Sequence, residues 1–168
     1  MSQPLPQLPK PEFIVIHVKT SSGVPAQIAA DLRETGIPGG LIGYEYRPLS
    51  EAAVLDGTGE RGLVAIATSG LFGRVAIDAA TGRMVHVPEV ASAVANHVNK
   101  DLKSFNRCVA AVIARFPFYE DDEERCEEVA EEVREVISAI DGTALAKDGF
   151  WETFCDDVGM GDYANWVW

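Results

Sequence analysis

The stretch LFGRVAIDAATGRMVHVPEVASAVANHVNKDLKSF, residues 71–105, decides the fold of this chain. Within it, residues 74–78 and residues 83–87 both alternate between polar and apolar side chains, as half-buried strands do. The four residues between them end in Gly82, which can adopt the positive φ that a short hairpin turn needs. We therefore predict a β-hairpin over residues 74–87.

The sequence on either side of the hairpin extends this unit. Residues 62–68, GLVAIAT, predict a third strand and hence an antiparallel meander. After Pro88, Asn99 is a good N-cap for a long helix, which Pro117 is expected to end. The apolar positions of this helix share one face and are Leu102, Phe105, Val109, Val112, Ile113 and Phe116.

The remaining elements are predicted from local signals. Residues 13–18 and residues 41–46 are interpreted as strands, and residues 49–55 as a short helix or a loop. A helix is expected over residues 25–35, between a starting proline and a terminating glycine. Four prolines in the first eleven residues predict a flexible arm over residues 1–12, followed by one domain over residues 13–168.

This order of elements, and the residues of the quoted stretch, resemble the SUKH superfamily of bacterial immunity proteins, in particular its fourth subfamily from polymorphic-toxin gene clusters. The resemblance extends to DGFWETFCDDVGMGDY, residues 148–163, and covers about residues 36–163. In the family an Asn opens the long helix and a Ser usually follows, whereas Lys100 and Asp101 follow Asn99 here.

From the pattern and the resemblance together we expect an α+β fold. It would have an N-terminal helix, a twisted antiparallel sheet of about four to six strands, and three C-terminal helices packed largely on one face. The resemblance implies an immunity protein that binds and neutralises a cognate toxin domain without catalysis.

Length and composition agree with one domain. A chain of 168 residues with 47% hydrophobic residues can build a single core. No apolar run approaches ~20 residues and no signal peptide opens the chain, so we expect a cytoplasmic protein that does not enter membranes. The three cysteines, Cys108, Cys126 and Cys155, are expected to stay reduced.

Charge is distributed unevenly along the chain. Residues 1–119 hold 11 basic and 10 acidic residues, whereas residues 120–168 hold 3 basic and 16 acidic residues. Residues 120–135 carry ten of these acidic side chains on a segment whose apolar stripe is helical. The predicted stripe comprises Cys126, Val129, Ala130, Val133, Val136, Ile137 and Ile140.

Two interpretations of this acidic segment remain open. It is either a solvated surface helix or a face that binds a basic toxin, such as a nuclease or a nucleic-acid deaminase, whose own substrate is a polyanion. The same charge argues against nucleic acid or anionic membranes as partners. The candidate toxin-binding residues are Glu120, Asp121, Glu124, Glu127, Glu128, Glu131 and Glu135.

Aromatic residues at the C-terminus supply a second set of candidates. Phe150, Trp151, Phe154 and Val158 share one helical face and are expected to pack in the core. Tyr163, Trp166 and Trp168 either fold back or contact a partner, so Trp166 and Trp168 join the candidate toxin-binding residues. Both a monomer and a homodimer are compatible with this pattern.

The sequence gives little evidence for a catalytic or metal-binding motif. Residues 57–62, GTGERG, fit a dinucleotide motif but precede a predicted strand instead of following one. His17, His86 and His97 are far apart, and no paired-cysteine motif accompanies them, so no metal and no cofactor is expected. The alternatives to an immunity protein are an adaptor without a toxin partner and a small enzyme with an unrecognised acidic site.

Overall fold

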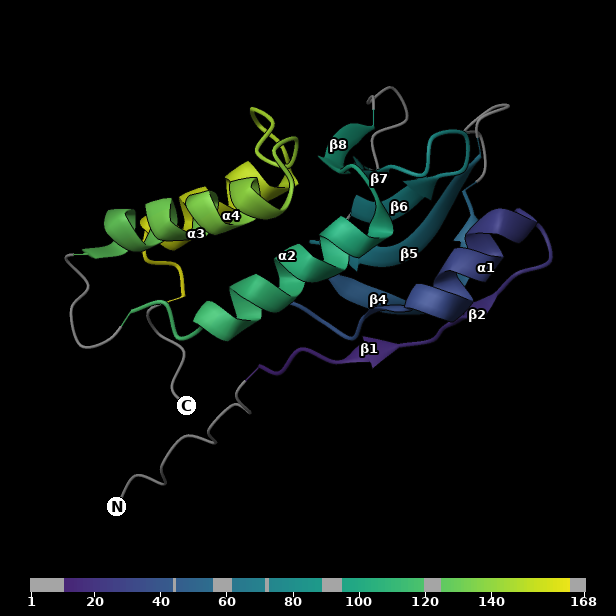
Figure 1. Ribbon diagram of the computed structural model, residues 1–168, viewed down its shortest axis with the longest axis horizontal. Coiled ribbons are helices and arrows are strands. Elements are labelled where there is room, and N and C mark those ends of the chain that lie inside the picture. The colour runs from purple at the N-terminus through teal and green to yellow at the C-terminus, as the bar shows by residue number, and fades with distance from the viewer. Residues whose placement is uncertain are drawn as a thin grey trace, which may run out of the picture.

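The computed structural model describes residues 11–43, 45–55, 62–71, 73–88, 95–119 and 125–163. Within these residues it has four helices, a six-stranded sheet and a separate pair of short strands (Figure 1). One helix precedes the central strands and three follow them. The predicted α+β fold is confirmed.

The main sheet has the order β2-β4-β5-β6-β7-β8. Its strands are β2 (Lys19–Thr20), β4 (Arg47–Val54), β5 (Leu63–Ser69), β6 (Gly73–Asp78), β7 (Met84–Val87) and β8 (Asn96–Asn99). Neighbouring strands are antiparallel except at one edge, where β2 runs parallel to β4. The predicted meander therefore forms the centre of the sheet.

The predicted hairpin is confirmed as β6–β7, and its register places Val75 opposite His86. Its turn closes through the backbone amide of Gly82, which donates to the carbonyl of Asp78 at 2.7 Å. Gly82 has a φ of 75°, a conformation that suits glycine because it has no Cβ. The Asp78 carboxylate also accepts from the amide of Ala80 at 2.9 Å, so local chemistry alone specifies this turn.

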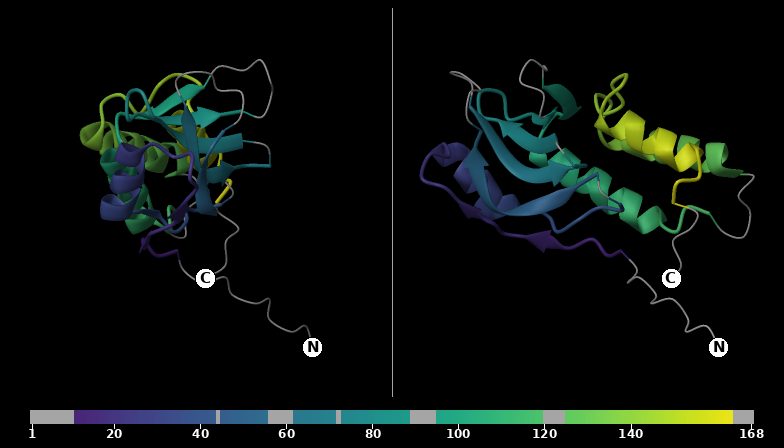
Figure 2. Two further views of the ribbon diagram at one scale, coloured as in Figure 1. Left: turned by 90° about the vertical axis from the view of Figure 1, so that its right-hand side faces the viewer. Right: turned by 180° about the vertical axis from the view of Figure 1, so that it is seen from behind.

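The four helices lie to one side of the sheet (Figure 2, left). They are α1 (Ala26–Thr35), α2 (Leu102–Arg115), α3 (Cys126–Ile140) and α4 (Phe150–Gly159). The two last helices run side by side, and α3 also contacts α2. Gly36 ends α1 with a φ of 69°, as its position in the sequence predicts.

Aromatic side chains hold α2 and α4 against the sheet. The ring of Phe105 lies 5.4 Å from the ring of Tyr46 and 6.1 Å from that of Trp151, measured between centroids. The predicted core face of α4 is confirmed, because Phe150, Trp151, Phe154 and Val158 are all buried. Tyr163 also folds back: it is 6% exposed and its ring centroid lies 5.5 Å from that of Phe154.

The strand predicted over residues 41–46 is wrong. Gly43 has a φ of 78°, which is incompatible with an extended strand, and the segment bends there. Its apolar residues Ile42 and Tyr46 are both buried, although the segment forms no strand. The Tyr46 hydroxyl donates to the carbonyl of Pro38 at 3.0 Å. The strand starts at Arg47 instead, so most of the segment interpreted as a short helix or loop belongs to β4.

The long strand predicted over residues 13–18 is also wrong. Only Val15–Ile16 forms a strand there, β1, which pairs with β3 (Ile37–Pro38) outside the main sheet. The backbone amide of Gly39 donates to the carbonyl of Ile14 at 2.9 Å, so the pairing extends by one further hydrogen bond and then stops. Hydrophobicity alone does not produce a longer strand, because a strand also needs a partner along its length. Residues 1–10, most of the predicted flexible arm, lie outside the described residues.

Asn99 is not the N-cap of the long helix. It ends β8, and Asp101 caps α2 by accepting from the amide of Ser104 at 2.7 Å. Both residue types suit a cap, but the chain must leave the sheet before the helix can begin. The side chain of Asn99 is fully buried and serves another purpose, described below.

Candidate functional site

Helix α3 carries five glutamates on the side that faces away from the core. At 3.6 residues per turn they fall within an arc of about 140°, opposite the buried Val129, Val133 and Ile137. All five are exposed. We call this surface the acidic face, and its residues are Glu127, Glu128, Glu131, Glu132 and Glu135.

The acidic face brings together four of the predicted toxin-binding residues, Glu127, Glu128, Glu131 and Glu135. Glu120, Asp121 and Glu124 lie outside the described residues, as do Trp166 and Trp168. Glu132 was missed, although its helical spacing places it on the same face. Val136, predicted in the apolar stripe, is 43% exposed because it lies at the edge of the buried arc.

Arginines neutralise part of this face from within the molecule. Arg115, at the end of α2, contacts Glu132 at 2.8 Å, and this hydrogen bond and charge hold the pKa of the Glu132 carboxyl below its usual range. Arg125 contacts Glu128 at 2.8 Å. Among the ion pairs that join described residues, none involves Glu127 or Glu135, so these two carboxylates are the more available for an external partner.

Arg134 links the acidic face to α4. Its guanidinium lies 2.7 Å from the carboxylate of Asp156, 3.7 Å from that of Glu152 and 3.4 Å from that of Glu131. Partial burial opposes its charge, but the surrounding negative groups outweigh this and raise the pKa of Arg134. One cation thus serves three carboxylates, and the negative surface continues from α3 onto α4.

The end of α4 is crowded with like charges. Burial raises the pKa of the Asp157 carboxyl, and the neighbouring carboxylates of Asp162 and Asp156 raise it further. These acids also sit near the C-terminal end of a helix, where the helix dipole disfavours negative charge. A positively charged partner would relieve this repulsion. These acids belong to the negatively charged C-terminal region of the sequence, but no local pattern predicts that they lie beside α3.

A buried polar network joins β8 to α4 and to the end of α3. Asn99 donates from Nδ2 to the Asp141 carboxylate at 2.9 Å and accepts at Oδ1 from the Trp151 indole at 2.8 Å. Asp141 also accepts from the amide of Lys100 and from the amide and hydroxyl of Thr143. Burial by itself would raise the pKa of Asp141, but these hydrogen bonds lower it to about 2. We assign this network to stability, because its members satisfy one another.

The other potentially reactive side chains are in unreactive settings. Burial raises the pKa of the Cys108 thiol to about 11 and that of the Cys155 thiol to about 12, so both stay protonated at neutral pH. Burial lowers the pKa of His86 and of His97, and His97 is hydrogen-bonded to the Thr143 hydroxyl at 2.8 Å. In the part of the chain that the structure describes, no group of three or more potential ligands could hold a metal ion.

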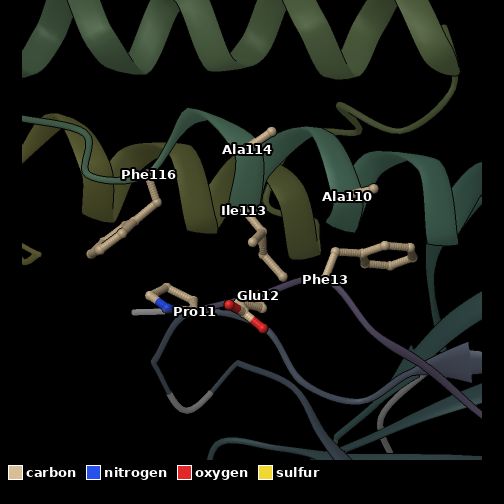
Figure 3. A pocket seen from close by; sticks show the side chains of 7 residues that line it. All are labelled: Pro11, Glu12, Phe13, Ala110, Ile113, Ala114 and Phe116. Carbon is tan, nitrogen blue, oxygen red and sulfur yellow. The ribbon is translucent and has the colours of Figure 1, made fainter. Parts of the chain in front are cut away.

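An apolar groove runs between α2 and the segment that leads into β1 (Figure 3). Pro11, Glu12 and Phe13 lie on one side, and Ile113 of α2 and Phe116, the residue that follows this helix, approach them from the other. Among the described residues that line the groove, Glu12 is the one that carries a charge. These described residues are suited to packing and offer no set of groups for chemistry.

A family model described as SUKH-4 immunity protein matches residues 20–157, which is most of the chain. No curated protein and no solved structure matches it significantly. None of the helices among the described residues is long and apolar enough to cross a membrane. Residues 57–61 of the dinucleotide-like glycine motif lie outside the described residues.

Proposed function

Since the chain belongs to the SUKH-4 immunity protein family, we propose that it binds a cognate toxin domain directly and neutralises it without catalysis. The family match over residues 20–157 is the observation that carries this proposal. The site of action is the cytoplasm, and the partner is a basic toxin domain, for example a nuclease or a nucleic-acid deaminase. The acidic face supplies the contact surface.

The charge of the acidic face supports a basic partner. Residues 125–140 carry five glutamates and two arginines, a net charge of −3, and α4 adds Glu152, Asp156 and Asp157 beside them. Toxins that act on nucleic acids need positive charge around their own active site. A negative protein surface can occupy that region in place of the phosphate backbone and so exclude the substrate. The same surface repels nucleic acids and anionic membranes.

Long-range attraction is useful for this task. Opposite charges raise the rate at which two proteins meet, and this gain falls as salt shortens the Debye length to about 8 Å at 0.15 M. Glu127 and Glu135 are expected to contribute most, because Glu128, Glu131 and Glu132 already contact arginines. The complex should therefore form fastest at low salt and lose affinity steeply as salt rises.

The test is co-expression with the toxin domain encoded beside this gene, followed by measurement of growth rescue and of affinity at low and high salt. The key variant is Glu127→Lys with Glu135→Lys. It should weaken the complex about tenfold or more at low salt and flatten the salt dependence.

A matched control changes the same net charge elsewhere. Glu12 and Glu34 are exposed and lie on the N-terminal segment and on α1, so Glu12→Lys with Glu34→Lys preserves the acidic face. If both double variants weaken the complex equally, overall charge and not the acidic face is responsible. If the unmodified protein neither rescues growth nor binds, the proposed function is wrong for this toxin.

A further inference from the structure

A pocket of about 260 Å³ lies where the start of α4 meets β7 and β8. In Figure 1 these elements come together at the edge of the sheet where β8 lies. Five separate segments of the chain contribute described residues to it, so no sequence motif marks it. The residues on which the inference rests are Glu45, Ser69, His86, Asn96, Asp148 and Phe150.

The surface that lines the pocket is mainly apolar, with an aromatic ring and two acidic residues among it. The acidic residues are Glu45 and Asp148, and none of the described residues that line the pocket is Lys or Arg. His86 adds no compensating charge at neutral pH, since burial lowers its pKa. Its ring lies 6.5 Å from the ring of Phe150, measured between centroids. Ser69 and Asn96 add oxygen atoms that can accept hydrogen bonds.

The groups that line the pocket are held in place. Glu45 accepts at Oε1 from the buried hydroxyl of Tyr163 at 2.6 Å. Gly73 leaves room for His86, because a Cβ at this position would lie 2.6 Å from Nε2 of the imidazole. Asp148 has a φ of 57°, which places its side chain at the start of α4 in a conformation that Asp and Asn tolerate better than other residues. Side chains that are already held in place lose little conformational entropy when the pocket binds a ligand.

An exposed apolar side chain lies next to the pocket in the sequence. Leu71 follows Ser69 in the turn between β5 and β6 and is 87% exposed, more than the other large hydrophobic side chains that the structure describes. A pocket that carries acidic residues, with an exposed leucine two residues from one of its lining residues, is typical of a protein contact, in which apolar burial accompanies recognition of one specific side chain.

We propose that this pocket receives an arginine side chain of the toxin domain. This inference rests on the proposed function and adds to it a specific anchor outside the acidic face. A guanidinium carries five donors and a planar face, so it can contact two carboxylates and stack on an aromatic ring at once. The volume is below the range of about 300–1,000 Å³ that is usual for drug-sized ligands, which favours a single side chain.

The first test uses a small probe and needs no toxin. N-acetyl-arginine methylamide is titrated into the full-length protein, and amide shifts are followed by NMR. We expect shifts at His86 and at residues 148–150, none with the uncharged isostere N-acetyl-citrulline methylamide, and none in the Asp148→Asn, Glu45→Gln double variant. Equal shifts with both probes, or no shifts with either, would overturn the inference.

The second test measures affinity for the toxin domain by calorimetry. Asp148→Asn removes the charge and keeps a residue that tolerates this φ, so it should weaken the complex about tenfold. The control is Asp31→Asn on α1, where affinity should stay within about twofold.

The outcomes separate the two proposals. Full affinity in the Asp148→Asn variant would reject the arginine pocket and leave the proposed function standing. If the unmodified protein fails to bind the toxin domain, the proposed function fails, and the arginine titration alone decides whether the pocket recognises a guanidinium.

Discussion

The indole Nε1 of Trp151 donates a 2.8 Å hydrogen bond to Oδ1 of Asn99, and both side chains are fully buried. This contact joins the first turn of α4 to the last residue of β8, 52 positions earlier in the chain. Because Asn99 also donates to Asp141, one amide links the sheet, the end of α3 and α4.

Asn99→Ala should therefore lower the free energy of unfolding by about 2–3 kcal/mol, because it leaves the Trp151 indole without an acceptor and removes a donor from Asp141. Urea unfolding followed by circular dichroism measures the change. Asn96→Ala is the matched control, since Asn96 is exposed in the same strand, and its effect should stay below about 0.5 kcal/mol. Equal losses in both variants would contradict a special role for Asn99.

Asp141 should make stability depend on acid pH. The pKa of its carboxyl is about 2 in the folded protein and about 3.9 in an unfolded chain. A depressed folded pKa gives stabilisation that is complete above about pH 4 and is lost as pH falls toward 2, in total on the order of 2 kcal/mol. Urea unfolding measured at several values between pH 2 and pH 5 tests this.

Two variants isolate the Asp141 contribution. Asp141→Asn should be less stable at neutral pH, and its difference from the unmodified protein should narrow between about pH 4 and pH 2. Thr143→Val removes one of the hydrogen bonds to Asp141 and should give an intermediate profile. If the difference in the free energy of unfolding stays constant over this range, another group causes the loss of stability at acid pH.

The cap of α2 can be tested directly. Asp101→Ala should cost about 1 kcal/mol in the free energy of unfolding, since the amide of Ser104 loses its acceptor. Asp101→Ser should restore most of this, because a serine hydroxyl can also cap a helix. If the alanine variant is as stable as the unmodified protein, Asp101 does not set the start of this helix.

Arg134 should weaken the attraction between the acidic face and a basic partner, because its positive charge offsets part of the negative charge there. Arg134→Met removes the cation that contacts Glu131, Glu152 and Asp156. Because solvent reaches these carboxylates and screens the ion pairs, we expect the loss of stability to be only about 0–1 kcal/mol. If the proposed function is right, association with a basic toxin domain should become faster at low salt, on the order of twofold. Stopped-flow kinetics measures this, with Arg33→Met on α1 as the charge-matched control. Equal rate changes in both variants would remove Arg134 from this role.

The thiols should differ in reactivity. Cys108 and Cys155 are buried and their pKa values are raised to about 11 and 12, whereas Cys126 is only half-buried. Ellman's reagent should therefore modify about one thiol per native molecule quickly and the other two only after unfolding. Cys126→Ser should abolish the fast reaction. Fast modification of a second thiol would show that the core opens more readily than its packing indicates.

Short-range patterns predicted much of the fold. Alternation and Gly82 specified the β6–β7 hairpin, and helical spacing specified α2 and α3, because these signals act between residues a few positions apart. The same spacing correctly placed four glutamates of the acidic face on the exposed side of α3. The prediction of a strand over residues 41–46 was wrong, because the apolar side chains of Ile42 and Tyr46 are buried as in a strand although the chain bends at Gly43.

The sequence by itself determined the hairpin, the amphipathic helices and the concentration of negative charge after residue 119. Only the tertiary structure decided which of those charges meet a cation, because Arg115 reaches Glu132 from a different helix. It also decided that Asn99 is buried beside Asp141 and Trp151, and that Glu45, His86 and Asp148 line one pocket. These residues lie tens of positions apart, and no local preference encodes a contact that forms only when the whole sheet and its helices have packed.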